Sequence, residues 1–533
     1  MTIASHSIAR HLICKLFQVK TSCNTNLQKR LQSKATMPKG KHNAEDSGLE
    51  QLYEWASVET EGGRHTPEDD LQPCVPPKFV LAKDVKGSQP YTVKSSTPLK
   101  TRFRIKPIYF QGPKHKGSRT RVFAWLSLPI FDQDSPKQTV PGVVLVHGGG
   151  GTAYKEWCER WAIDAGFASI SIAVEGQTDV ALNEQDPETN MLFERVACSA
   201  DQESNNLCGT PGPFRKGRAY GDWENPLEDQ WMFHAVADAL LAAQLLRSLP
   251  NVNKRQVGIL GVSWGSVITS TAIGFDSRNH DKDESLFAFA IMGYGCGSMS
   301  NSLSHIGRQI RMKPRGAQSA KELYDSIWDP VLRLPRIQTT PTMWISWPQE
   351  FHFPLPDQAN NYNKMKPPVM TLIIPQLGHG HKPVYGLKEQ YEFANSVLKM
   401  GDYHHNKKMF LWAEQVNVPD PEDIDAQILK AKVQGEPYIK FQVEFKLVST
   451  KQFAEATLVS THDSIDMISS ERKWNCTQIH SVTQKTADQP RCLWIIQTEV
   501  ATETTGWYII LKTKDNLRVS SRFHQISPQV AKS

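Results

Sequence analysis

The chain has 533 residues, of which 39% are hydrophobic and 22% charged, and its formal net charge at pH 7 is +6. A chain of this length is expected to form two or more domains, and it has no apolar run of about eighteen residues that would predict a membrane span. No basic stripe with interleaved aromatic residues occurs in the body of the chain, so we predict no nucleic-acid partner.

Residues 1–48 are basic and rich in Ser, Thr and Asn, and the first acidic residue is Glu45. Residues 8–17 are suited to a basic amphipathic helix, which is typical of a mitochondrial transit peptide. A disordered basic tail, with translation starting functionally at Met37, is the alternative that the sequence leaves open. Arg10 and Lys15 interrupt any apolar core of a secretory signal. We therefore predict an intracellular protein, which is mitochondrial under the first alternative.

Residues 49–404 are predicted to form one α/β domain. Its beginning, 49–100, is polar with few periodic runs, which predicts a wrapping segment with little regular structure. Strands are predicted at 101–110 and 121–129, on either side of a turn rich in Lys and Gly. The domain thus begins with β structure.

Further along, short apolar runs are typical of strands that are buried on both faces of a parallel sheet. They lie at 143–146, 168–172, 257–260, 287–292, 343–345 and 369–374. Helical patterns at 154–164 and 229–249 lie between them, so we predict an α/β sheet with right-handed crossovers. Residues 176–227 are polar and interrupt this alternation, which predicts a long loop insertion that could act as a lid.

Residues 405–533 have a different pattern. Residues 439–447 alternate strictly between apolar and polar, which predicts a strand with one wet face. Further β runs follow, at 493–496, 506–511 and 517–519. This part is predicted to be a separate C-terminal all-β domain, most simply a small sandwich.

The nine cysteines are scattered, and none forms a Cys-x-x-Cys pair or a Cys/His cluster with zinc spacing. Cys198 could pair with Cys208, and Cys476 with Cys492. The alternative for all of them is a free and mostly buried thiol.

The turn Gly261-Val262-Ser263-Trp264-Gly265 follows the apolar run 257–260 and precedes a helical pattern. This strand–turn–helix context is that of a nucleophile elbow, in which a serine at the tip of a strained turn projects at the edge of the sheet. Glycines two positions before and after the serine keep side chains from colliding across the turn. Ser263 is therefore the predicted nucleophile.

A second signal is the run of four glycines, 148–151, directly after the strand at 143–146. Such a loop gives one amide of an oxyanion hole, and the residue after the nucleophile gives the other. The predicted donors are the amides of Trp264 and of Gly149 or Gly150.

The same loop is also compatible with a dinucleotide-binding turn. The looser form of that fingerprint is met by Gly148, Gly150 and Ala153, with Glu175 after the next strand. Because the nucleophile elbow is present as well, this interpretation ranks second.

The general base should be a histidine after the last core strand, and the acid should follow the strand before it. His379 is the predicted base and His381 the reserve, since both lie in the loop after residues 369–374. Glu350 is the predicted acid, because it is the first carboxylate after the strand at 343–345. Asp357 is its fallback.

Several motifs between His147 and His381 resemble, in order, the family of acetyl-xylan-esterase-like and prolyl-oligopeptidase-like α/β hydrolases. They are His147-Gly-Gly-Gly-Gly-Thr152-Ala153, Lys155-Glu156-Trp157, Trp231-x-x-His234-Ala235-Val236-Ala237-Asp238-Ala239, Gly261-Val262-Ser263-Trp264-Gly265-Ser266, Tyr294-Gly295-Cys296-Gly297, Trp328-Asp329-Pro330, Phe353-Pro354-Leu355 and His379-Gly380-His381. The resemblance implies an α/β-hydrolase fold and a triad of Ser263, Glu350 and His379. It also implies that the C-terminal β domain is an appended sandwich.

The chain departs from this family's pattern in two places. Relatives have a glycine-rich turn with an aspartate where this chain has Ser346-Trp347-Pro348-Gln349-Glu350, and Ser266 replaces a frequent third glycine of the elbow. The first departure bears on the acid and the second on the shape of the turn.

These residues predict a serine hydrolase that needs no metal or organic cofactor. A carboxylic-ester hydrolase that acts on an acylated sugar or another small ester is the first choice. An amide or peptide hydrolase is an alternative, although residues 49–140 are too few for the propeller usual in such peptidases. A catalytically inactive hydrolase-fold binding protein is the other alternative, and it would lack a carboxylate close to His379.

Overall fold

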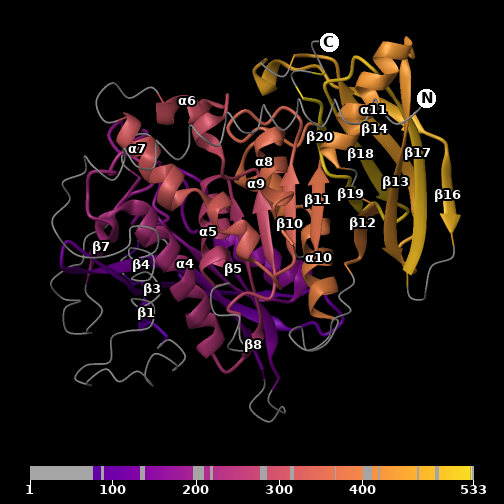
Figure 1. The fold of residues 1–533 in the computed structure, drawn as a ribbon. Helices are drawn as coiled ribbons and strands as arrows, with labels where there is room; N and C mark the ends of the chain where they lie inside the picture. Colours follow the sequence, from indigo (N-terminus) through magenta and orange to yellow (C-terminus); the bar gives the residue numbers. More distant parts are fainter. Residues whose placement is uncertain are drawn as a thin grey trace. The chain divides into compact units, whose positions relative to one another are not determined.

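The computed structural model describes residues 76–83, 85, 89–131, 138–195, 209–215, 220–276, 285–311, 317–366, 368–399, 411–417, 420–464, 467–485, 491–527 and 530 (Figure 1). These belong to one compact unit, 48–533. The predictions made for residues 1–48, for a Cys198–Cys208 bridge and for a domain boundary at 404 lie outside the described residues.

A large mixed sheet forms the core of this unit. In spatial order its strands are β1 (Phe79–Leu81), β3 (Arg102–His115), β4 (Ser118–Ile130), β6 (Ala168–Ile172), β5 (Val140–Val146), β8 (Val252–Val262), β9 (Ala290–Gly293), β10 (Thr342–Ser346), β11 (Val369–Ile373), β19 (Arg518–Ser520), β18 (Gly506–Thr513), β14 (Phe453–Thr461) and β15 (Asn475–Ile479). From β6 to β11 all neighbours are parallel, while β3, β4 and β6 pair antiparallel. This order is that of the predicted α/β-hydrolase fold.

Helices cover both faces of the parallel strands, as the continuous apolar runs predicted. Along β5, Val144 and Val146 belong to the core cluster that includes α4 (Trp231–Ser248) and α5 (Trp264–Asp276). Val143 and Leu145 belong to the opposite cluster, with α3 (Lys155–Arg160) and α10 (Lys388–Leu398). Successive side chains of a strand point to opposite faces, so one short strand contributes to both cores.

The C-terminal strands form a sandwich, as predicted. Its second sheet has the order β12 (Ala413–Asn417), β13 (Tyr438–Val448), β17 (Arg491–Ala501) and β16 (Val482–Lys485), all antiparallel. Every second residue of β13 is buried from Ile439 onward, and the Phe441 ring lies 5.0 Å from the Trp507 ring of β18. Helix α11 (Pro421–Gln434) precedes β13 and packs on it.

The sequence did not predict that one sheet of the sandwich continues the central sheet. Strand β19 pairs with β11 through Ser520 and Thr371, whose hydroxyl donates to the Ser520 carbonyl at 2.8 Å. Figure 1 shows the C-terminal strands beyond β11 at this end of the sheet. The contact covers an edge strand whose backbone would otherwise be unpaired.

Smaller elements complete the described part. Strand β2 (Tyr91–Lys94) pairs with β3, β7 (Thr210–Pro211) with β4, and β20 (His524–Gln525) with β18. Two short strands thus lie in the described part of 49–100, where little regular structure was predicted. Of the predicted insertion, the described residues include β7, a bridge between Ala181 and Phe193 and, at residue 227, the start of a short 3-10 helix, Leu227–Asp229.

Four further helices follow β9, β10 and β11 along the chain: α6 (His305–Arg311), α7 (Ala317–Leu323), α8 (Leu355–Tyr362) and α9 (His381–Tyr385). Among the described residues, no helix has the length and apolar character that a membrane crossing requires. Cys476 and Cys492 lie in β15 and β17 as free thiols, so the bridge considered between them is absent.

Candidate active site

Ser263 lies at the sharp turn between β8 and α5. Its backbone is left-handed, with a φ of 57°, and its amide donates to the Gly293 carbonyl of β9 at 2.7 Å. A Cβ on Gly261 would collide with the Gly265 carbonyl, and one on Gly265 with the Val146 carbonyl. Because these gaps are too narrow for any side chain, the two glycines allow the strained serine conformation.

Ser266 explains why the third glycine of the elbow is dispensable here. Its hydroxyl donates to the Gly261 carbonyl at 2.7 Å and lies 2.8 Å from the Gly293 carbonyl. The side chain therefore ties the start of α5 to β8 and β9, instead of colliding with them. This departure from the family's pattern leaves the turn in place.

His379 follows β11 and faces the turn. Its Nε2 lies 3.0 Å from the Ser263 hydroxyl, and its Nδ1 lies 2.8 Å from Oε2 of Glu350. Tyr294 packs against the imidazole with ring centroids 5.2 Å apart. The three side chains predicted for the triad therefore form one continuous line of hydrogen bonds.

Glu350 is fully buried and surrounded by donors. Besides His379, its carboxylate accepts from the indole Nε1 of Trp347 at 2.7 Å and from the amides of His352 and Phe353 at 2.9 and 3.4 Å. Hydrogen bonds from N–H groups favour the ionised form of a buried carboxyl group. The altered loop thus places the Glu350 side chain against His379, and no sequence pattern identified the tryptophan as a donor.

Asp357, the fallback acid, lies elsewhere. It is in the first turn of α8, and its carboxyl group accepts the hydroxyl hydrogen of Ser302. Burial raises its pKa to about 7, against the opposing hydrogen bond from Ser302. The carboxylate that contacts His379 is that of Glu350.

The Gly-rich loop, 147–151, is fixed by two imidazoles. The amide of Gly148 donates to Nε2 of His381 at 2.7 Å. His147 is fully buried; its Nδ1 lies 2.6 Å from the Gly148 carbonyl, and its Nε2 accepts from the Val174 amide at 3.0 Å. Burial lowers the pKa of His147 to about 4 and that of His381 to about 3, so both rings are neutral near pH 7. His381, the reserve base, therefore contacts the loop and not the Ser263 hydroxyl.

The predicted oxyanion donors differ in their surroundings. Trp264 is the first residue of α5, so its amide is one of the four N–H groups that a helix leaves unpaired. The Gly149 amide has no hydrogen-bond partner within the described residues, whereas the Gly150 amide interacts with the buried carboxyl group of Glu175. The amides of Trp264 and Gly149 are thus available to a ligand, whereas the amide of Gly150 is already bonded to Glu175.

Glu175 also bears on the dinucleotide interpretation of this loop. Its side chain is 1% exposed, and its Oε1 lies 3.3 Å from Nε of Arg215. A ribose-binding carboxylate would have to face a ligand. Glu175 instead forms a buried ion pair with a residue of the insertion, so the loop lacks the acidic group which that interpretation needs.

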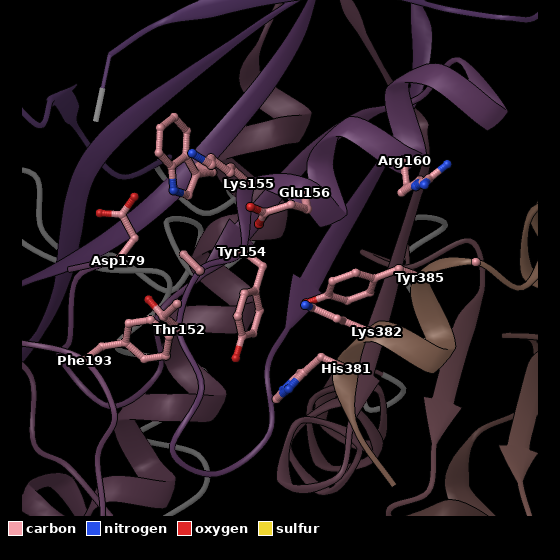
Figure 2. A pocket seen from close by; sticks show the side chains of 13 residues that line it. Thr152, Tyr154, Lys155, Glu156, Arg160, Asp179, Phe193, His381, Lys382 and Tyr385 are labelled. Atoms are coloured by element: carbon pink, nitrogen blue, oxygen red, sulfur yellow. The ribbon is translucent and has the colours of Figure 1, made fainter. Parts of the chain in front are cut away.

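A cavity of about 780 Å³ adjoins the site on the far side of His381. Tyr154, from the segment before α3, and His381, from α9, both line it (Figure 2), and their ring centroids are 4.8 Å apart. Phe193 of the insertion also lines it, and charged groups of both signs lie on its rim, among them Asp179 and Lys382. The cavity provides space for part of a ligand next to the Gly-rich loop.

Metal ligands were not predicted. Within the part of the chain that the structure describes, no group of three or more His, Cys, Asp or Glu side chains is placed to hold a metal ion.

No family model matches the sequence, and no curated protein is significantly similar to it. Similar solved structures include an acetyl xylan esterase from a Paenibacillus species, with 18% identity, a TM-score of 0.40, and coverage of 63% of this chain and 96% of that one. Another is acetyl xylan esterase 1 from a Thermoanaerobacterium species, with 15% identity, a TM-score of 0.39, and coverage of 59% and 90%.

A third is a puromycin-hydrolyzing peptidase from Mycobacterium tuberculosis, with 16% identity, a TM-score of 0.35, and coverage of 58% and 39%. These three similar structures are thus two esterases and one peptidase. At identities and TM-scores this low, they assign no activity to this chain.

Proposed function

We propose that the protein is a serine hydrolase that cleaves carboxylic esters, with Ser263 as nucleophile, His379 as general base and Glu350 as the group that orients the imidazole. The observation that carries this proposal is the line of hydrogen bonds from the Ser263 hydroxyl through both nitrogens of His379 to a buried carboxylate. A serine is a weak nucleophile unless an adjacent base accepts its proton.

In the proposed reaction, Ser263 attacks the ester carbonyl carbon while His379 takes the hydroxyl proton. The amides of Trp264 and Gly149 stabilise the oxyanion of the tetrahedral intermediate. His379 then gives its proton to the leaving alcohol, and the C–O bond to the alcohol breaks. Water, deprotonated by His379, attacks the acyl-enzyme and releases the acid. Glu350 remains ionised and stabilises the imidazolium ion throughout.

An ester is the first choice over an amide because an alcohol is a better leaving group than an amine. Assays with amide substrates test the alternative substrate class. The test is labelling of the purified protein with a fluorophosphonate probe, together with hydrolysis of 4-nitrophenyl acetate. Wild type should react with the probe and turn over the ester. Ser263→Ala should lose both, with kcat falling by about 10⁴-fold or more. Labelling that persists in Ser263→Ala would overturn the assignment of the nucleophile.

An inactive binding protein would show a different result. Well-folded wild type that neither labels nor hydrolyses esters or amides would favour it. The close contact between His379 and Glu350 supports the enzyme, because an inactive protein is expected to lack a carboxylate close to His379.

A further inference from the structure

Arg215 is a buried cation next to the Gly-rich loop, and the proposed reaction makes no use of it. It belongs to the insertion, and its side chain is 8% exposed. A Cβ placed on Gly149 would lie 2.7 Å from Nη2 of Arg215 and 2.9 Å from Cδ1 of Trp264. The absence of a side chain at position 149 therefore lets the guanidinium group approach the two residues whose amides we assign to the oxyanion.

The charge of Arg215 extends across the site. Burial is the main cause that lowers the pKa of His147 and of His352 to about 4, and the guanidinium charge of Arg215 contributes to both shifts. His147 belongs to the Gly-rich loop, while the His352 ring lies 4.7 Å from that of His379. The charge of Arg215 is thus close enough to affect both imidazoles.

Glu175 pairs with only one edge of the guanidinium group. The contact joins Oε1 of Glu175 to Nε of Arg215, and within the described residues the two Nη groups have no hydrogen-bond partner. A guanidinium group offers its donors in a planar fork that matches a carboxylate. Glu175 therefore engages the Nε edge, and the guanidinium carbon lies 5.5 Å from the centroid of the Trp264 ring, so the Nη groups keep donors for a further acceptor.

The charges in this cluster do not balance. Burial raises the pKa of Glu175, and both Arg215 and Arg195 oppose this by favouring the ionised carboxylate. Two guanidinium groups thus surround one carboxylate. When Glu175 is ionised, these three groups together carry one positive charge, which favours an anion close to them.

We propose that Arg215 binds a carboxylate carried by the acyl part of the substrate, so that half-esters of short dicarboxylic acids are the preferred substrate class. This inference rests on the proposed function, because the guanidinium group adjoins Gly149 and Trp264, where the carbonyl oxygen of the acyl group would be held. Within this proposal we assign the acyl half of the ester, rather than the alcohol half, to Arg215.

The test compares two methyl esters that share a leaving group and nearly share a shape. Monomethyl succinate carries a carboxylate, and methyl 4-methylpentanoate is its neutral isostere. Proton release gives kcat/KM for each, and the ratio of the two values reports the preference for charge. Wild type should favour the succinate by roughly tenfold or more, as expected of a charge-assisted pair.

The variants separate the charge of Arg215 from the stability of the fold. Arg215→Met alone would leave Glu175 buried without its cation, so the double variant Arg215→Met with Glu175→Gln removes both charges. Its ratio should fall to about one. Glu175→Gln alone should keep the preference. Arg255→Met, an exposed arginine near the opposite end of β8, is the matched control and should keep the wild-type ratio.

A second readout does not depend on catalysis. Succinate should raise the Tm of Ser263→Ala protein, since a ligand that binds the folded state stabilises it, and should not do so when Arg215 and Glu175 are also replaced. A wild-type ratio near one, with no Tm shift, overturns the inference while leaving the esterase intact. If the double variant keeps the wild-type preference for monomethyl succinate, the inference is also overturned. Any loss of activity would then affect both esters equally, as expected if Arg215 acts on the oxyanion. If wild-type protein were not labelled by the fluorophosphonate probe, the proposed function itself would be refuted.

Discussion

Glu350 and Asp357 are two carboxyl groups of one segment, between β10 and the first turn of α8, with very different surroundings. Four N–H donors meet at the Glu350 carboxylate, including the ring of His379. Asp357 has a serine hydroxyl as its side-chain donor, and burial raises its pKa to about 7. The comparison teaches that burial alone does not prepare a carboxyl group for catalysis: the donors that hold it in contact with the imidazole do.

The largest expected effect comes from exchanging each carboxyl group for its amide. Glu350→Gln should lower kcat for 4-nitrophenyl acetate by about 10³–10⁴-fold, because an amide neither stabilises the imidazolium ion nor fixes the tautomer of His379. Asp357→Asn should change kcat by less than about threefold. Steady-state kinetics on both variants, with circular dichroism as the check of folding, decides between the two residues. Equal losses would show that the segment acts through its structure and not through one carboxylate.

A smaller effect should come from the indole that supports Glu350. Trp347→Phe removes the donor to Oε2, the same oxygen that contacts His379, and should lower kcat by about tenfold with little change in KM. Trp344→Phe is the matched control, since this buried indole of β10 has no hydrogen-bond partner within the described residues. An unchanged kcat in Trp347→Phe, or an equal loss in both variants, would mean that the indole serves packing alone.

The site could be predicted from the sequence to the extent that chain order and turn chemistry determine it. The elbow around Ser263 is local, so glycine spacing reveals it. His379 and His381 lie two positions apart in one loop, and His379 was predicted as the base with His381 as the reserve. What separates them is tertiary: Glu350 and Ser263 reach the first ring, whereas the second lies against Gly148 and Tyr154.

In the fold, too, local patterns could be predicted from the sequence and long-range contacts could not. Continuous apolar runs predicted the parallel strands because burial on both faces leaves no polar period. Strand β19 pairs with β11 through one residue pair, Thr371 with Ser520, which are far apart in sequence. Neither strand has a sequence pattern that predicts this pairing. The role of Arg215 was equally invisible, since it depends on a buried partner and on the space above Gly149.

The smallest expected effect concerns Asp357 and pH. Its folded-state pKa, about 7, lies above the ordinary value of 3.8 for an aspartate, so between these values the folded protein keeps a proton that the unfolded chain has lost. Stability that Asp357 contributes in its protonated form is therefore lost as the pH rises from about 4 to 7. Asp357→Asn lacks this titration. Relative to wild type, its free energy of unfolding should increase between pH 5 and pH 8, by on the order of 2 kcal/mol.

Thermal or urea unfolding of both proteins at the two pH values measures this difference. Asp423→Asn, which removes an exposed carboxylate from α11, controls for the loss of one charge. If the difference between Asp357→Asn and wild type stayed constant with pH, Asp357 would be ionised in the folded state at both values, as a carboxylate with enough donors is. The contrast with Glu350 would then have to lie in the geometry that presents each group to His379, since both would carry the same charge.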